Sequence, residues 1–211
     1  MSQRSILCVG VFALVLAKSA SLEIENSNSS EDIFEFYNTS ELIWTTNTTA
    51  KQRRVCKVDL KETITRDNVT FRRSFYDGRR GIIGEYIGTF RKFGTFNRTA
   101  RQPNDTMDVK KNNGYRTHSV VTEVLHYQSA DNSCAVFWIL GTYWGSLTPW
   151  YELRMRDSKI KKGFHYEDSC WEALNSTRQR IRPAYHPKCQ IVLKDKYPNP
   201  REGEHSRKQI F

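Results

Sequence analysis

The side chains that most often carry catalysis or bind metals are scattered in this sequence. The five histidines show no spacing that would make a metal site or pair one of them with a nucleophile. They are His118, His126, His165, His186 and His205. There is no glycine-rich phosphate loop, no Gly-x-Ser-x-Gly elbow and no acid pair with glycosidase spacing. We therefore expect a protein that is not an enzyme and uses no metal or other cofactor.

The cysteines are better suited to disulfides than to thiol or zinc chemistry. Cys8 falls in a predicted signal peptide, which leaves Cys56, Cys134, Cys170 and Cys189. None of them has the close Cys-x-x-Cys spacing that zinc or redox sites use. An even number of cysteines in an oxidising compartment predicts two disulfides. Four cysteines allow three pairings, and the sequence alone leaves these open.

Asn-x-Ser/Thr motifs are unusually frequent. The composition would give roughly two of them by chance, whereas the sequence has seven, and each is an acceptor for an N-glycan in the secretory route. The excess predicts an extracellular eukaryotic glycoprotein with these positions on its surface. The seven asparagines are Asn28, Asn38, Asn47, Asn68, Asn97, Asn104 and Asn175.

The first twenty residues have the order of a secretory signal peptide. Arg4 precedes an apolar run from Ile6 to Ala17, and small residues follow up to Ala20. The run is too short to cross a bilayer, and no later stretch approaches the roughly 20 apolar residues of a membrane helix. We expect a secreted, soluble chain that begins near Ser21.

The positive charge of the chain is dispersed. Removal of the signal peptide lowers the formal net charge by two, from +10 to +8. Local basic clusters are only pairs, which favours a solvated surface over a nucleic-acid site, and no membrane partner is expected either. These pairs include Arg53-Arg54, Arg72-Arg73, Arg79-Arg80 and Lys161-Lys162.

The elements that would position any site are short strands. Stretches of β-branched and aromatic residues recur between turn residues such as Asp77-Gly78. Eight of them suffice to close a small antiparallel barrel. The predicted strands are 41–46, 55–65, 68–76, 84–93, 106–110, 115–126, 134–141 and 150–156. A helix is predicted over 164–177, with Asp168 or Ser169 as its cap. Residues 33–196 form the predicted domain, between a flexible arm at 21–32 and a tail at 197–211.

The last predicted strand alternates most clearly. Because successive residues of a strand face opposite sides, it has two rows of side chains. One row is Tyr151, Leu153 and Met155, and the other is Trp150, Glu152, Arg154 and Arg156. Acidic strand residues are usually solvated, so the pattern alone places Glu152 outside.

Three segments together resemble the salivary lipocalins of ticks, the histamine-binding family. They are Ser133–Trp138 (SCAVFW), Trp150–Ser158 (WYELRMRDS) and Asp168–Cys170 (DSC). The resemblance covers most of the mature chain and implies an all-β, eight-stranded antiparallel lipocalin barrel with a C-terminal helix packed on its wall. It also implies disulfides Cys56–Cys189 and Cys134–Cys170.

The resemblance implies stoichiometric capture of a small host mediator, with an amine such as histamine or serotonin as the default ligand. Two positions depart from the family's amine pattern: Ala135 stands in place of an acid and Arg154 in place of an aromatic residue. Glu152 remains, and Glu123 could also face an ammonium group. The aromatic residues Trp138, Trp44 and Tyr86 are candidate cage members, although large aromatics more often fill cores.

Two other functions remain open. Arg154, with Arg91 and Arg72 as further candidates, could bind the carboxylate of an eicosanoid such as a leukotriene or thromboxane. Alternatively, the loops of a monomeric barrel could bind a host plasma protein of complement or clotting.

Overall fold

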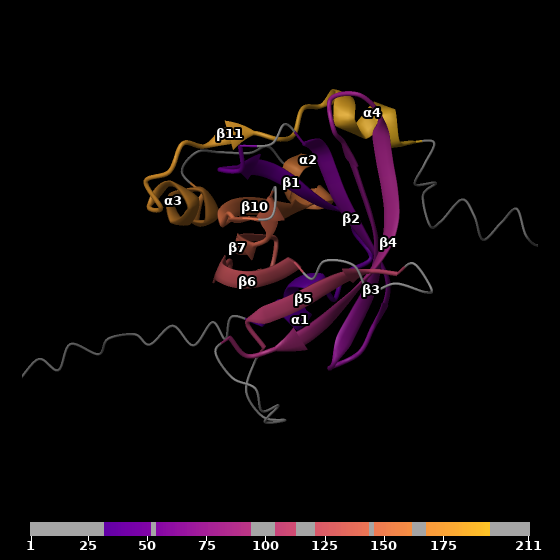
Figure 1. The fold of residues 1–211 in the computed structure, drawn as a ribbon, viewed down its shortest axis with the longest axis vertical. Helices are drawn as coiled ribbons and strands as arrows, with labels where there is room; N and C mark the ends of the chain where they lie inside the picture. Colours follow the sequence, from indigo (N-terminus) through magenta and orange to yellow (C-terminus); the bar gives the residue numbers. More distant parts are fainter. Residues whose placement is uncertain are drawn as a thin grey trace, which may run out of the picture.

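The computed structural model describes residues 32–51, 54–93, 104–112, 121–143, 146–161 and 168–194. Its main feature is a closed antiparallel barrel (Figure 1). The barrel strands are β1 (Ile43–Thr48), β2 (Val55–Ile64), β3 (Asn68–Tyr76), β4 (Gly81–Arg91), β5 (Thr106–Lys111), β6 (Val121–Gln128), β7 (Cys134–Leu140) and β10 (Trp150–Arg156). Each strand pairs with its neighbour, and pairing of β10 with β1 closes the barrel.

The predicted eight-stranded barrel is therefore confirmed, with shifts at some strand ends. Strand β4 begins three residues before the predicted Gly84 because it pairs with β3 up to Gly81. The turn at Asp77-Gly78 forms as expected: the Asp77 carboxylate accepts hydrogen bonds from the amides of Arg79 and Arg80. Gly78 has a φ of 92°, which other residues rarely adopt. The predicted strand at 115–126 begins outside the described residues.

Further short elements lie around the barrel. They are α1 (Ile33–Tyr37), β8 (Thr142–Tyr143), β9 (Ser146–Leu147), α2 (Asp157–Lys161), α3 (Ser169–Asn175), β11 (Arg182–Pro183) and α4 (Lys188–Lys194). Helix α3 confirms the described part of the predicted helix, and the Asp168 carboxylate caps it by accepting from the amide of Cys170. Helices α1, α2 and α4 lack a strong helical period and were not predicted. No helix in the described ranges is long and apolar enough to span a membrane.

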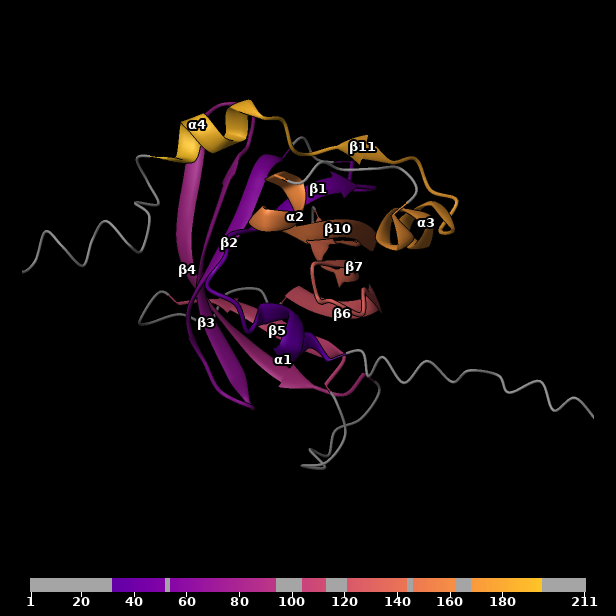
Figure 2. The ribbon, with the colours of Figure 1, turned by 180° about the vertical axis from the view of Figure 1, so that it is seen from behind.

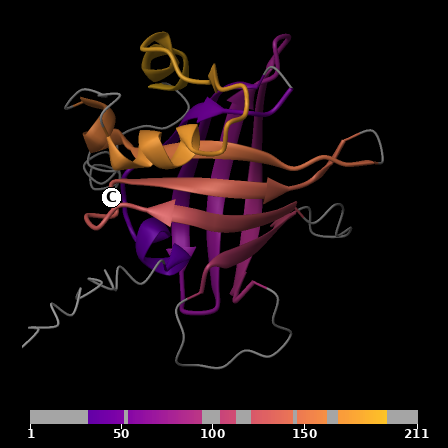
Figure 3. The same cartoon turned by 90° about the vertical axis from the view of Figure 1, so that its left-hand side faces the viewer.

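Buried apolar side chains form three clusters. One fills part of the barrel interior and includes Ile33 and Phe36 of α1, which are fully buried. A second lies outside the barrel, between β7, β10 and helix α3, which covers the outer face of these strands (Figure 3). The third joins Trp44 and Val58 to Cys189 of α4. Figure 2 shows α4 beside the ends of β2 and β4.

Two disulfides attach these outer segments to the barrel. Cys56 of β2 is bonded to Cys189 of α4, and Cys134 of β7 to Cys170 of α3. This is the pairing that the resemblance implies. Their sequence separations are 133 and 36 residues, so each restrains a long loop of the unfolded chain.

Candidate functional site

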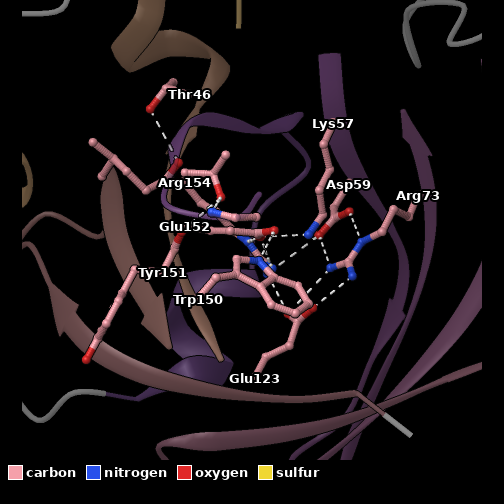
Figure 4. A network of polar contacts seen from close by, with 12 residues as sticks. Thr46, Lys57, Asp59, Arg73, Glu123, Trp150, Tyr151, Glu152 and Arg154 are labelled. Carbon is pink, nitrogen blue, oxygen red and sulfur yellow. Dashed lines mark hydrogen bonds and ion pairs between the residues drawn. The ribbon is translucent and has the colours of Figure 1, made fainter. Parts of the chain in front are cut away.

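Strand β10 turns its polar row into the barrel and its apolar row outward. Leu153 and Met155 pack outside against α3, where Leu174 is also buried. Glu152 and Arg154 point into the interior and are 5% and 1% exposed (Figure 4). The alternation was predicted correctly, but the expectation from pattern alone that Glu152 is solvated is wrong. Helix α3 covers the outer face, so on this strand the outside is apolar.

Six buried charged side chains form one chain in which acids and bases alternate. Their order is Asp59, Arg73, Glu123, Arg154, Glu152 and Lys57 (Figure 4). Strands β2, β3, β6 and β10 contribute these residues from different sides of the barrel. Their formal charges cancel, and every member has an oppositely charged neighbour. Pairing of this kind offsets the cost of removing charges from water.

Arg73 connects the first two acids. Its Nε and Nη2 atoms donate to the two carboxylate oxygens of Asp59 over 2.6 and 2.7 Å, and Nη1 donates to Glu123 Oε1 over 2.8 Å. The guanidinium carbon lies 4.9 Å from the ring centroid of Phe71 and 5.7 Å from that of Tyr86. These aromatic rings and two acids fix the side chain in place.

Arg154 is the central cation of the chain. Its Nη1 atom donates to Glu123 Oε2 over 2.5 Å and to the Tyr37 hydroxyl over 2.6 Å. Its Nη2 and Nε atoms donate to Glu152 Oε2 over 2.6 and 3.0 Å. The guanidinium also lies over the ring of Phe137. All three guanidinium nitrogens of Arg154 therefore already donate hydrogen bonds to partners within the protein.

The Lys57 end of the chain borders a small cavity. Lys57 Nζ lies 2.6 Å from Glu152 Oε2, its one ion-pair partner among the described residues. The Trp150 indole donates to the other oxygen of Glu152 over 3.1 Å. The cavity has a volume of about 20 Å³. Its lining comprises Lys57, Glu152 and Trp150 together with Thr45, Thr48, Ala50, Arg54 and Ala184.

The charges within the barrel decide which groups are ionised. Burial favours the neutral acid, but the positive charges of Lys57 and Arg154 outweigh it and lower the pKa of Glu152 to about 2. Arg154 and Arg73 likewise outweigh burial and hold the pKa of Glu123 well below its ordinary value. Such carboxylates stay ionised at neutral pH, so they suit a counter-ion rather than a general acid.

Lys57 is the least favourably placed charge of the six. Burial disfavours its ammonium form, and the nearby guanidinium groups of Arg154 and Arg73 repel it. Its pKa is therefore lowered to about 8, despite the attraction of Glu152. An ammonium with this pKa is easier to neutralise or displace than an ordinary lysine side chain.

Four of the six predicted ligand residues lie in the interior. Arg154 donates hydrogen bonds to both Glu123 and Glu152. Tyr86 stacks on Phe71, with ring centroids 5.8 Å apart, and reaches the charged chain through Arg73.

Trp44 and Trp138, named above as candidate cage members, do not face the barrel interior. Trp44 is fully buried outside the barrel wall, where it packs on Tyr185 and its indole donates to Asp157 over 3.0 Å. Trp138 pairs across the sheet with Tyr151, on the outer face, and contacts the ring of Phe93. Because side chains alternate along β1 and β7, neither indole faces the interior.

The sequence reasoning missed several interior residues, which are Tyr37, Lys57, Asp59, Arg73 and Trp150. A signal for some of them exists in β2, where Lys57 and Asp59 alternate with the apolar residues Val58 and Leu60. The same alternation of charged and apolar residues occurs in β10. A strand whose outer face is covered by a helix can have its charged side chains facing the interior. Opposite charges on separate strands then have to balance one another.

The sequons that the structure describes lie at accessible positions. Asn38 and Asn175 are exposed, and Asn47, Asn68 and Asn104 are partly exposed. These positions are compatible with N-glycans, which remain a prediction. Asn28 and Asn97 lie outside the described residues.

One group of residues within the described ranges has the compactness of a metal site. It consists of Cys134, Asp168 and Cys170. Both cysteine sulfurs are joined in a disulfide, so neither can be a thiolate ligand. The group therefore has a structural role beside the cap of α3.

Comparison with solved structures identifies the fold. The AM182 serotonin complex matches with 16% identity and a TM-score of 0.50 over 74% of this chain and 90% of that chain. Japanin from Rhipicephalus appendiculatus bound to cholesterol matches with 12% identity and a TM-score of 0.39 over 69% and 91%. Bovine odorant-binding protein matches with 10% identity and a TM-score of 0.42 over 75% and 96%.

At such low identity the likeness shows the fold alone, and this is the lipocalin fold. Two of these proteins were solved with serotonin and with cholesterol, and the third is an odorant-binding protein. No protein-family model matches the sequence, and no curated protein matches it either.

Proposed function

We propose that this protein is a secreted, salivary lipocalin that captures a small host amine, such as histamine or serotonin, and so helps evade host haemostasis and immune response. Capture is stoichiometric and involves no chemistry on the ligand. The observation that carries the proposal is the buried Glu152 carboxylate, which holds an ammonium group, that of Lys57, beside a cavity.

The ligand's ammonium group would take the place of Lys57 on Glu152. Lys57 is the end of the alternating chain, so its replacement by another cation leaves the five other charges paired as before. Its lowered pKa makes it the cation that is most easily removed. The Trp150 indole lies against the same carboxylate and offers an aromatic face to an amine. The shared fold of AM182, solved with serotonin, supports this proposal by analogy.

This interior is less suited to binding an eicosanoid. Arg154 is 1% exposed and bonded to Glu123, Glu152 and Tyr37. The other candidates, Arg72 and Arg91, lie on the outer face of the barrel wall and pair with acids there. A ligand carboxylate would therefore meet a buried carboxylate next to Lys57, and the two would repel each other.

Calorimetry at two pH values tests the proposal. We expect serotonin or histamine to bind, and to bind up to about 10-fold more tightly at pH 9 than at pH 7, because Lys57 loses its proton while an ordinary primary amine stays charged. Lys57→Met should bind more tightly at pH 7 and lose this pH dependence. A leukotriene should show the opposite trend. If none of these ligands releases heat at either pH, the amine proposal fails.

Glu152→Gln gives a second arm with a matched control. It should remove amine binding, because the neutral amide cannot balance a buried ammonium. Glu62→Gln also removes one carboxylate from an ion pair, but this pair with Arg72 is partly exposed on the outer face. Its amine affinity should equal that of the unchanged protein.

A second function is favoured by the size of the cavity. A pocket for a drug-sized ligand usually has about 300–1,000 Å³, and the cavity at Glu152 has about 20 Å³. A barrel with a filled interior can act through its surface instead, on a host protein of complement or clotting. Surface plasmon resonance with purified factors would test this, and Glu152→Gln should then bind like the unchanged protein.

A further inference from the structure

A basic hollow lies on the outer surface, between the segment that follows β1 and the segment that enters β11. Its volume is about 770 Å³. It is lined by Thr49, Ala50, Lys51, Gln179, Arg180 and Arg182. Strand β11 lies beside β1 (Figure 1) and holds the second segment in place by pairing with it. The amide of Ala184 also donates to the carbonyl of Thr46 over 2.8 Å.

The arginines of this segment form a row with period two. Arg178, Arg180 and Arg182 alternate with Gln179 and Ile181. Arg178 ends the turn after α3 with a φ of 54°, the left-handed conformation that often terminates helices. Ile181 packs inward on the apolar cluster under α3. Arg180 and Arg182, on either side of Ile181, line the hollow, whereas Arg178 is not among its described lining residues.

The lining of the hollow offers donors and positive charge. Lys51, Arg180 and Arg182 supply three cations, and no acid is among the described residues that line it. Thr49 and Gln179 add neutral hydrogen-bonding groups. Guanidinium groups bind planar or tetrahedral oxyanions through paired hydrogen bonds. A surface of this composition, open along its length, fits a polymer that carries repeated anionic groups.

We infer that this hollow binds a sulfated polysaccharide of the kind found on cell surfaces and in extracellular matrix. The inference rests on the proposed secretion but not on amine capture. Among the described lining residues, alanine is the largest apolar side chain, whereas a protein partner needs apolar or aromatic anchors. Single-stranded nucleic acid would need aromatic rings for base stacking, and none of these described residues is aromatic. A sulfated sugar needs neither.

The hollow is separate from the interior site. The residues that line the two share only Ala50, and neither Lys57 nor Glu152 belongs to the hollow. Glu152→Gln should therefore leave polysaccharide binding intact. A failure of the amine proposal and a failure of this inference can thus be told apart.

Heparin affinity measured over a range of salt concentrations tests the inference on the deglycosylated, full secreted chain. The variant combines Lys51→Gln, Arg180→Gln and Arg182→Gln. The slope of log affinity against log salt should fall by about 2 to 3, because each lost contact with a polyanion removes roughly 0.7 to 0.9. A milder variant with only the first two changes leaves β11 unaltered and should lose about two thirds as much.

The matched control removes three exposed cations elsewhere, through Arg66→Gln, Arg79→Gln and Lys110→Gln. Its heparin slope should change by less than about 1. On a sulfopropyl cation exchanger, which reports total charge, both triple variants should elute equally early. Equal loss of heparin affinity in both triple variants would overturn the inference. Tighter binding to a single-stranded DNA oligonucleotide or to phosphatidylserine vesicles than to heparin would overturn it as well.

Discussion

Arg154 is the cation whose loss should disturb the interior most. Replacement by methionine keeps much of the side-chain volume but removes the donors to Glu123, Glu152 and Tyr37. Glu123 then retains Arg73 and Glu152 retains Lys57, and the buried group as a whole carries one uncompensated negative charge. Removing one partner from a buried ion pair costs about 3–5 kcal/mol, and we expect a loss of this size in the free energy of unfolding at pH 7.

The loss in the free energy of unfolding caused by Arg154→Met should be smaller at acidic pH. In the unchanged protein, the pKa of Glu152 is lowered to about 2, from 4.5. The stabilisation from this ionised carboxylate is complete above the unfolded-state pKa and is lost as the pH falls toward 2. At pH 3.5 the unchanged protein has lost roughly 1 kcal/mol of the stabilisation from this group. In Arg154→Met the pKa of Glu152 is lowered less strongly. The difference in the free energy of unfolding between the two proteins should therefore decrease by about that amount.

Urea denaturation, followed by tryptophan fluorescence at pH 7 and pH 3.5, measures both effects. Arg91→Met is the matched control, because Arg91 makes a two-point ion pair with Asp108 that is partly exposed on the outer face. It should cost less than about 1 kcal/mol. Adding Glu123→Gln to Arg154→Met restores a neutral interior and should recover part of the stability. Equal costs at both arginines, or an additive loss in the double variant, would refute the reasoning.

Two further predictions concern stability. Replacing Cys56 and Cys189 by serine should lower the free energy of unfolding by about 5 kcal/mol, because this disulfide closes the longer loop. The same change at Cys134 and Cys170 should lower it by about 4 kcal/mol. Urea denaturation compares the two variants, and a larger loss at the second disulfide would contradict the loop-entropy argument. Lys57 loses its proton in the folded protein at a pH of about 8 and in the unfolded chain near 10.5, so the folded state binds fewer protons in between. Between pH 8 and pH 10 the free energy of unfolding should therefore rise by about 2 kcal/mol relative to Lys57→Met, which denaturation at these two pH values measures. A flat difference would show that the ammonium is not destabilised by burial.

The barrel could be predicted from the sequence because its strands carry local signals. Turn residues such as Asp77-Gly78 separate β-branched and aromatic stretches, and the count of eight strands matches a closed barrel. Helices α1, α2 and α4 could not be predicted in the same way. Helix α1 has five residues and is held by burial of Ile33 and Phe36 in the interior cluster, a tertiary effect that no local pattern reports.

The interior site could be predicted only in part, and the reason lies in what covers the barrel. Alternation along a strand shows that two faces differ, but it does not show which face is inside. In β10 the usual assignment is reversed, since α3 buries Leu153 and Met155 on the outer face. The disulfide between Cys134 and Cys170 ties α3 to that face, and so it helps to keep Glu152 and Arg154 inside. Reduction of this disulfide should therefore weaken amine binding as well as stability, even though neither cysteine lines the cavity.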